Sequence, residues 1–221
     1  MVGRIAEEVD TEKRLAQLRT HTAFRSPWGE WPGASSAEVW STGSPEMDDA
    51  LGGGLPRGKL VEVVGERSSG RTSFVWGGVA AATQREEYVT WIDVNDALDP
   101  QSAQRAGVVL SRLLWLRLDE QRWEEQTFRA AEEIIRGGGF QVVVLDAVGR
   151  RRLRHSSSRW FRLKRALRGT SLVCLVLSDA RQGIGADLRL RCRWVRGDRG
   201  GYAVEILRQR GGVAGRVVLL S

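Results

Sequence analysis

Apolar and polar positions along the chain predict strands and helices in alternation from residue 59 onward. The expected strands are 59–64, 88–93, 113–116, 140–145 and 171–177, and the expected helices are 72–83, 100–106, 124–136 and 158–168. Runs 140–145 and 171–177 are almost continuously apolar, which is typical of parallel strands buried on both faces. This order predicts an α/β fold with a mostly parallel, doubly wound sheet.

The pattern changes after residue 187. Residues 188–195 alternate apolar residues with arginines, residues 197–201 read as a turn, and segments 202–208 and 216–220 follow as further strands. We expect these segments to extend the parallel sheet with antiparallel C-terminal strands. Arg189, Arg191 and Arg193 are interpreted as the exposed face of an edge strand, where charge guards against unwanted pairing.

The N-terminal part has a different character. Residues 4–20 are polar with a thin apolar stripe and predict a lone helix, and residues 24–45 form a linker rich in Trp, Pro, Gly and Ser. We therefore divide the chain into residues 1–39, the N-terminal helix and linker, and residues 40–221, the core with its strand extension. The helix either docks on a partner or packs back on its own core.

Composition limits the class of protein. The chain has 221 residues, of which 42% are hydrophobic, enough for a full core. No apolar run approaches the ~20 residues of a membrane span, and the acidic N-terminus does not resemble a secretory signal. We expect a cytoplasmic protein without membrane contact, in which Cys174 and Cys192 are buried free thiols rather than a disulfide.

Charge is strongly segregated along the chain. Residues 150–221 carry 17 arginines and one lysine against four acidic residues, whereas residues 1–149 carry 16 basic against 23 acidic residues. Such asymmetry indicates an anionic partner on one side of the molecule.

Residues 65–72, Gly-Glu-Arg-Ser-Ser-Gly-Arg-Thr, match a phosphate-binding loop in which arginine replaces the usual lysine. Glycines allow backbone N–H groups to surround a phosphate at a helix N-terminus. The candidate nucleotide-binding residues here are Gly65, Ser69, Gly70, Arg71, Thr72 and Ser73. Arg71 keeps the positive charge, but its guanidinium is planar and bulkier than an ammonium group.

An acidic residue, Asp146, directly follows the predicted buried strand of residues 140–145. Asp146 follows four apolar residues, which fits a carboxylate that holds magnesium through water, although acids at strand ends also cap loops. Because the phosphate loop lies upstream, we favour the magnesium role for Asp146.

The motifs together resemble the RecA recombinase core over residues 40–178. Residues 40–44 read Trp-Ser-Thr-Gly-Ser, and residues 50–58 read Ala-Leu-Gly-Gly-Gly-Leu-Pro-Arg-Gly ahead of the phosphate loop. Residues 91–100, Trp-Ile-Asp-Val-Asn-Asp-Ala-Leu-Asp-Pro, resemble the RecA segment that carries the catalytic glutamate. The resemblance implies a RecA-like phosphate-loop core.

Four departures from the family fall in its ATPase machinery. Arg71 replaces lysine, Asn95 replaces the water-activating glutamate, Ser102 replaces an adenine-stacking tyrosine, and Asp179 replaces a glutamine that senses the γ-phosphate. An amide such as Asn95 cannot serve as a general base. We therefore expect a protein that is not an enzyme and has no catalytic residues, metal site or required cofactor, with at most weak binding of ATP and magnesium.

Where RecA has its first DNA-binding loop, this chain has an arginine-rich segment. The DNA-binding candidates are Arg150, Arg151, Arg152, Arg154, Arg159, Arg162 and Arg165. They either contact phosphates in a salt-sensitive way, with Trp160 and Phe161 as stacking platforms, or form the solvated face of a helix whose core residues are Trp160, Leu163 and Leu167.

In its short length and its altered motifs, the chain resembles the ImuA proteins. These are SulA-related RecA homologues of the damage-inducible mutagenesis cassette. This resemblance implies an accessory protein of SOS-type DNA-damage response that docks or regulates a translesion DNA synthesis assembly. Its partners would be RecA, an ImuB-type Y-family polymerase homologue, an error-prone replicative polymerase indirectly, and single-stranded DNA. The alternative is a slow DNA-dependent ATPase of the RecA/RadA kind.

Overall fold

A computed structural model describes most of the chain from Val39 onward. The described residues are 39–118, 121–149, 153, 157–179, 183–195, 201–209 and 215–220. The strands are β1 (Val39–Trp40), β2 (Leu55–Pro56), β3 (Leu60–Val64), β4 (Val89–Asp93), β5 (Leu113–Arg117), β6 (Val142–Asp146), β7 (Val173–Ser178), β8 (Leu188–Val195), β9 (Gly201–Gln209) and β10 (Val217–Leu220). The helices are α2 (Pro45–Leu51), α3 (Arg71–Gln84), α4 (Pro100–Arg105), the 3₁₀ turn η1 (Leu110–Arg112), α5 (Trp123–Gly137) and α6 (Ser157–Leu167).

The main sheet has the order β10-β9-β8-β3-β7-β6-β4-β5. Strands β3 to β8 pair in parallel, whereas β9 and β10 are added antiparallel. The predicted α/β class, with a mostly parallel sheet and antiparallel C-terminal strands, is therefore confirmed. Strand β3 lies inside the sheet, so the loop that follows it opens at the centre of the carboxyl edge.

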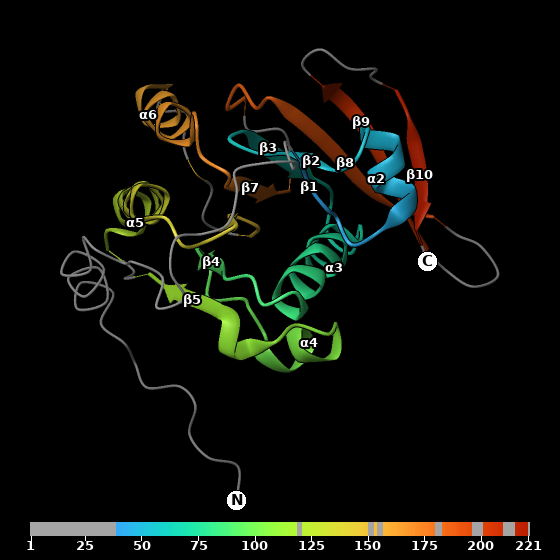
Figure 1. Cartoon of the computed structure of the whole chain (residues 1–221), viewed down its shortest axis with the longest axis horizontal. Helices are drawn as coiled ribbons and strands as arrows, with labels where there is room; N and C mark the ends of the chain where they lie inside the picture. The colour runs from blue at the N-terminus through green and yellow to red at the C-terminus, as the bar shows by residue number, and fades with distance from the viewer. Residues whose placement is uncertain are drawn as a thin grey trace, which may run out of the picture.

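Helices cover both faces of the sheet (Figure 1). One core, between the sheet and α2, α3 and α4, contains Trp40, Phe74 and Trp91. The other core lies under α5 and α6, and its members include Trp160 and Leu163. The prediction that Trp160, Leu163 and Leu167 are core residues is thus confirmed, and burial of this kind supplies the main stabilisation of the fold.

Helix α2 and the small β1–β2 pair were not predicted. The helix begins after Ser44, whose hydroxyl accepts a hydrogen bond from the Met47 amide, and Pro45 occupies its first turn. It ends at Gly52, which has a φ of 78°. Serine before proline and glycine after the last turn are the standard boundary signals of a helix, so this element was recognisable.

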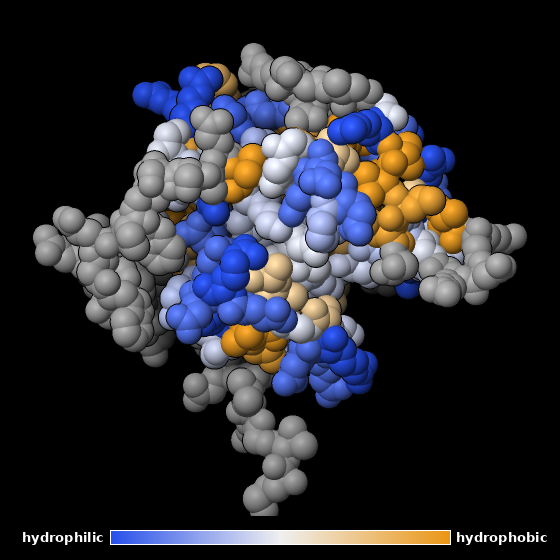
Figure 2. All heavy atoms as spheres, turned by 45° about the vertical axis from the view of Figure 1, so that its right-hand side comes forward, coloured by the Kyte–Doolittle hydropathy of each residue, from blue (hydrophilic) through white to orange (hydrophobic). Residues whose placement is uncertain are grey.

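The interpretation of β8 as an edge strand is wrong. Strand β8 lies between β3 and β9, and Arg189 is buried, whereas Arg191 and Arg193 are exposed as predicted. The edges are β5 and β10, and Val217 and Leu219 of β10 are exposed apolar residues. Figure 2 shows apolar side chains gathered on the side of the molecule where β10 lies.

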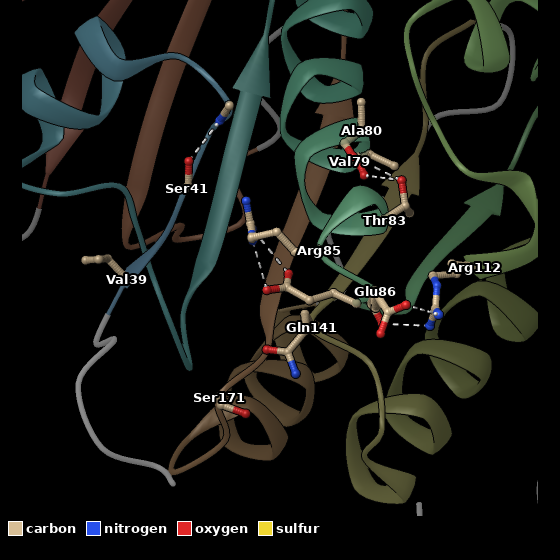
Figure 3. A network of polar contacts seen from close by, with 12 residues as sticks. Val39, Ser41, Val79, Ala80, Thr83, Arg85, Glu86, Arg112, Gln141 and Ser171 are labelled. Atoms are coloured by element: carbon tan, nitrogen blue, oxygen red, sulfur yellow. Dashed lines mark hydrogen bonds and ion pairs between the residues drawn. The ribbon is translucent and has the colours of Figure 1, made fainter. Parts of the chain in front are cut away.

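Polar contacts tie the elements together at the amino edge of the sheet. Arg57 donates to the Val39 carbonyl over 2.9 Å and also to the side chain of Gln141 and the carbonyl of Ser171. Figure 3 shows Arg112 facing Glu86, at 3.3 Å between Nη2 and Oε1. These contacts lie at the opposite end of the strands from the phosphate loop and have a structural role.

The two cysteines are free and buried, as predicted. Burial raises the pKa of each thiol to about 12, so neither is a thiolate near neutral pH. Among the described residues, no helix is both long and apolar enough to cross a membrane.

Candidate nucleotide-binding site

The candidate residues meet at the carboxyl edge of the sheet because four parallel strands end there. The phosphate loop follows β3, Asp93 ends β4, Asp146 ends β6, and Asp179 follows β7. In open α/β sheets this edge is where ligands bind. The structure therefore brings together residues that are distant in the sequence: Arg71 contacts Asp179, 108 positions away, and Asp93 pairs with Asp146.

The loop has the backbone geometry of a phosphate cradle. Gly70 has a φ of 86° and immediately precedes α3, so the free N–H groups of the first helical turn open at the loop. A Cβ atom at Gly70 would lie 2.4 Å from the Tyr202 ring, and one at Gly65 would lie 2.7 Å from the Cys192 carbonyl oxygen. Both positions therefore require glycine.

Arg71 lies inside the loop rather than in solvent. One Nη donates to the carbonyls of Gly65 and Glu66, the second at 2.9 Å, and the other Nη lies 3.0 Å from an oxygen of Asp179. The Arg71 side chain retains only 6% of its exposed surface. A buried guanidinium needs such partners, because an unpaired buried charge is costly.

Asp179 links the phosphate loop to the start of the arginine-rich segment. Its second carboxylate oxygen accepts a hydrogen bond of 3.1 Å from the Gly149 amide. Gly149 has a φ of 128°, and a Cβ atom there would lie 3.3 Å from the Asn95 side chain. Three positions that the sequence singled out separately, Arg71, Asn95 and Asp179, are thus joined in one cluster through Gly149.

Two carboxylates occupy the ends of adjacent strands. Asp93 and Asp146 are direct register partners of β4 and β6, and both are buried. Burial raises the pKa of Asp146 to about 7, and the charge of Asp93 adds to this, whereas the Val148 amide and Arg71 lower it. Asp93 accepts hydrogen bonds from the amides of Ala97 and Leu98 and from the Trp115 indole.

Ser102 has a local structural role. Its hydroxyl donates to Asp99 over 2.5 Å, and Asp99 in turn accepts from the Gln101 and Ser102 amides at the start of α4. This is an N-terminal helix cap. The hydroxyl at this position therefore completes a cap and does not supply a stacking surface.

The loop residues fit a bound phosphate. The Ser69 hydroxyl and the Arg71 Nε are buried and have no hydrogen-bond partner among the described residues, and buried donors of this kind normally find one. Among the described residues, no three His, Cys, Asp or Glu side chains are grouped so that they could hold a metal ion. Magnesium in phosphate-loop sites needs only one or two carboxylates in addition to substrate phosphates, and Thr72 and Asp146 are the residues available to it.

The arginine-rich candidates divide into three groups. Arg150, Arg151, Arg152 and Arg154 lie outside the described residues. Arg159 and Arg162 of α6 pair with Glu124 and Glu132 of α5, at 3.6 Å and 2.8 Å. Arg165 is exposed on α6, as is Phe161. Two of the arginines therefore hold helices together as well as facing solvent.

A known protein family matches the part of the chain that carries the phosphate loop and Asp146. The family model of the RecA N-terminal domain matches residues 29–153. RecA of Borreliella burgdorferi (strain ZS7) is 37% identical over 139 residues, which cover 61% of this chain and 37% of that protein. RecA of Acidothermus cellulolyticus is 42% identical over 112 residues, covering 50% and 32% respectively. The chain thus spans about a third of the length of these curated relatives.

A solved structure, that of the RadB recombinase, has a similar fold. Its TM-score is 0.65 at 19% sequence identity, and the match covers 82% of this chain and 94% of that one. The likeness extends past residue 153 into the C-terminal strands, since it includes most of the described residues.

These relatives overturn one expectation from the sequence. RecA and RadB recombinases are DNA-dependent ATPases, so the expectation that this chain is not an enzyme is contradicted. The substitutions at Arg71 and Asn95 alter the machinery without removing the loop, the buried carboxylates or the helix N-terminus. Since the family model matches more than half of its residues, the chain belongs to the RecA N-terminal domain family.

Proposed function

We propose that this chain is a slow, DNA-dependent ATPase of the RecA type, and that it acts as an accessory protein of the SOS-type DNA-damage response. The observation that carries the proposal is the formed phosphate loop with Arg71 inside it, where two buried donors, Ser69 Oγ and Arg71 Nε, have no partner within the part of the chain that the structure describes. A loop of this shape at the N-terminus of a helix binds anions through backbone N–H groups.

The residues have distinct roles in this proposal. Magnesium supplies charge that offsets the phosphates, and Thr72 and Asp146 would hold it. The amides of the loop and the Arg71 guanidinium contact the phosphates. Ionisation of Asp146 is opposed by its burial and by Asp93, so a cation that favours the ionised form would bind with release of a proton.

Turnover is slow because the base is missing. Asn95 occupies the position beside Gly149 at the same edge, and an amide cannot take a proton from the attacking water near neutral pH. General-base assistance contributes roughly 10²–10⁴-fold to rate. A RecA-type loop without that assistance still positions the phosphates and stabilises their charge, which is the larger part of phosphoryl-transfer catalysis.

The accessory role rests on the resemblance to ImuA proteins and on the charge distribution. In this proposal the chain links RecA to a translesion assembly through an ImuB-type Y-family polymerase homologue, and an error-prone replicative polymerase joins indirectly. Single-stranded DNA binds the arginine-rich segment that starts after Gly149. Arg165, which is exposed on α6, is a further contact for DNA in this proposal.

Phosphate release from ATP tests the enzymatic part. Purified wild-type protein with magnesium should release phosphate above the no-enzyme background, and single-stranded DNA should accelerate it. Asp146→Asn should abolish the release, whereas Glu86→Gln, which changes an exposed acid paired with Arg112 at the amino edge of the sheet, should leave it unchanged. Turnover that survives in Asp146→Asn would indicate a contaminating ATPase and contradict the proposal.

DNA and partner binding test the accessory part. Replacing Arg150 and Arg151 by glutamate should weaken single-stranded DNA binding and flatten its dependence on salt. Arg85→Glu, at the amino edge, is the matched control. Immobilised RecA should retain the full chain, and loss of that retention in residues 40–221 alone would assign the contact to residues 1–39. Failure of the full chain to bind RecA at low salt would refute the RecA link.

A further inference from the structure

The Arg71–Asp179 ion pair occupies the place where a bound phosphate would be neutralised. Of the two arginines in the loop, Arg67 is exposed and Arg71 is buried. The outer nitrogen of Arg71 faces a carboxylate at 3.0 Å. Asp179 is about one-quarter exposed, so it stands at the mouth of the loop, between the buried arginine and solvent. We propose that Asp179 competes with the phosphates of a nucleoside triphosphate for the Arg71 guanidinium. This inference rests on the proposed nucleotide-binding function.

The charges of Asp179 and of the phosphates determine whether Asp179 raises or lowers nucleotide affinity. Phosphate and carboxylate both seek the guanidinium, and both are stronger partners than a neutral acceptor. A polyphosphate that entered the loop while Asp179 remained on Arg71 would contact the guanidinium with a carboxylate only 3.0 Å from that same guanidinium. Phosphate and carboxylate are both negatively charged and would repel each other. Like charges so close raise the free energy of the bound state. Binding therefore requires the carboxylate to leave Arg71, and nucleotide affinity is lower than the loop alone would give.

Displacement of Asp179 also has a consequence beyond the loop. The same carboxylate holds the Gly149 amide at 3.1 Å, and Gly149 directly precedes the arginine-rich segment at Arg150. When the carboxylate leaves Arg71, that amide loses its acceptor or moves with it. Occupancy of the phosphate loop is thereby communicated to the backbone at which the basic segment begins.

Equilibrium binding of ATP with magnesium tests the proposal. Asp179→Asn keeps the shape of the side chain but removes its charge, and it should bind ATP about tenfold to a hundredfold more tightly than wild type, the range expected when a charged hydrogen bond no longer competes. In an Arg71→Ala background the same change should tighten binding by a smaller factor, because the carboxylate then still repels the phosphates but no longer holds the guanidinium. That difference distinguishes competition at Arg71 from a structural role of Asp179, which would persist without the arginine. Glu86→Gln, at the amino edge of the sheet, is the control for removing an acid from an ion pair elsewhere.

Hydrogen exchange at the Gly149 amide gives an independent readout. Saturating ATP should accelerate exchange there in wild type, and Asp179→Ala, which removes the acceptor of the Gly149 amide, should show fast exchange without ATP. Unchanged or weaker ATP affinity in folded Asp179→Asn would overturn the inference while leaving nucleotide binding itself intact. Absence of ATP binding in both proteins, each with wild-type circular dichroism, would instead overturn the proposed function and this inference with it.

Discussion

Glu62 and Arg189 form an ion pair of 2.5 Å in the interior of the sheet, and their side chains are 0% and 5% exposed. They are direct register partners of β3 and β8. Val176, the partner of Glu62 in β7, belongs to the core under α5 and α6, so the pair lies on that face. The pair thus joins the strand that leads into the phosphate loop to the C-terminal extension.

Breaking this pair should destabilise the fold strongly. Glu62→Gln leaves the buried Arg189 guanidinium without its counter-ion, which costs about 3–5 kcal/mol. Urea unfolding followed by circular dichroism measures the change. Glu62→Leu combined with Arg189→Met should recover most of the loss, because no charge then remains buried. Asp96→Asn, which removes an exposed pair with Arg117, should cost under ~1 kcal/mol; an equal cost for both pairs would contradict the account.

Two stacked indoles support the helix of the phosphate loop. The rings of Trp76 in α3 and Trp91 in β4 are 4.1 Å apart and nearly parallel, at 12°. Trp76→Ala should lower the free energy of unfolding by about 3–5 kcal/mol, since it removes a large buried side chain and leaves a cavity. Trp194→Ala is the matched control because Trp194 is 57% exposed. Thermal unfolding that is equally affected by both changes would argue against the stack as a core contact.

Asp146 should make stability depend on pH. Its pKa is raised from an ordinary 3.8 to about 7, so between these values the folded protein holds a proton that the unfolded chain has released. Stability therefore falls as pH rises through this window, by up to about 4 kcal/mol. Asp146→Asn should remove that part of the slope and be more stable than wild type at pH 8. Urea unfolding at pH 5 and pH 8 in EDTA tests this, and a wild-type slope that persists in Asp146→Asn would refute it.

Gly70 should tolerate no side chain. Gly70→Ala places a Cβ atom 2.4 Å from the Tyr202 ring at a φ of 86°, which combines a clash with a backbone conformation that L-residues rarely adopt. We expect a loss of roughly 1–3 kcal/mol and at least tenfold weaker ATP binding. Gly137→Ala, at a helical position with open space around it, should be neutral or stabilising by up to about 1 kcal/mol. Calorimetry measures the melting temperatures of the two variants. Equal melting temperatures for Gly70→Ala and Gly137→Ala would contradict the predicted clash with Tyr202.

The sequence predicted the sheet and the loop because both depend on local patterns. Strand β3, the glycine loop and α3 are consecutive, and apolar runs marked the buried parallel strands. Arg189 was misplaced because alternation with arginine indicates one solvated face, and only the addition of β9 and β10 turns β8 into an interior strand. One signal was overlooked: Glu62 within the apolar run Leu60–Val64 implies a buried partner of opposite charge. The contact between Arg71 and Asp179 joins loops after two strands and has no local signature.

The account depends most directly on whether the loop that carries Arg71 binds ATP. Isothermal titration of the full chain with ATP and magnesium, in parallel with Arg71→Ala and Arg71→Lys, measures this. We predict binding by wild type, retention by Arg71→Lys, and loss of at least tenfold in affinity in Arg71→Ala, because that change removes the buried cation at the phosphates. Binding by Arg71→Ala equal to that of wild type, or no binding by any of the three folded proteins, would contradict the account.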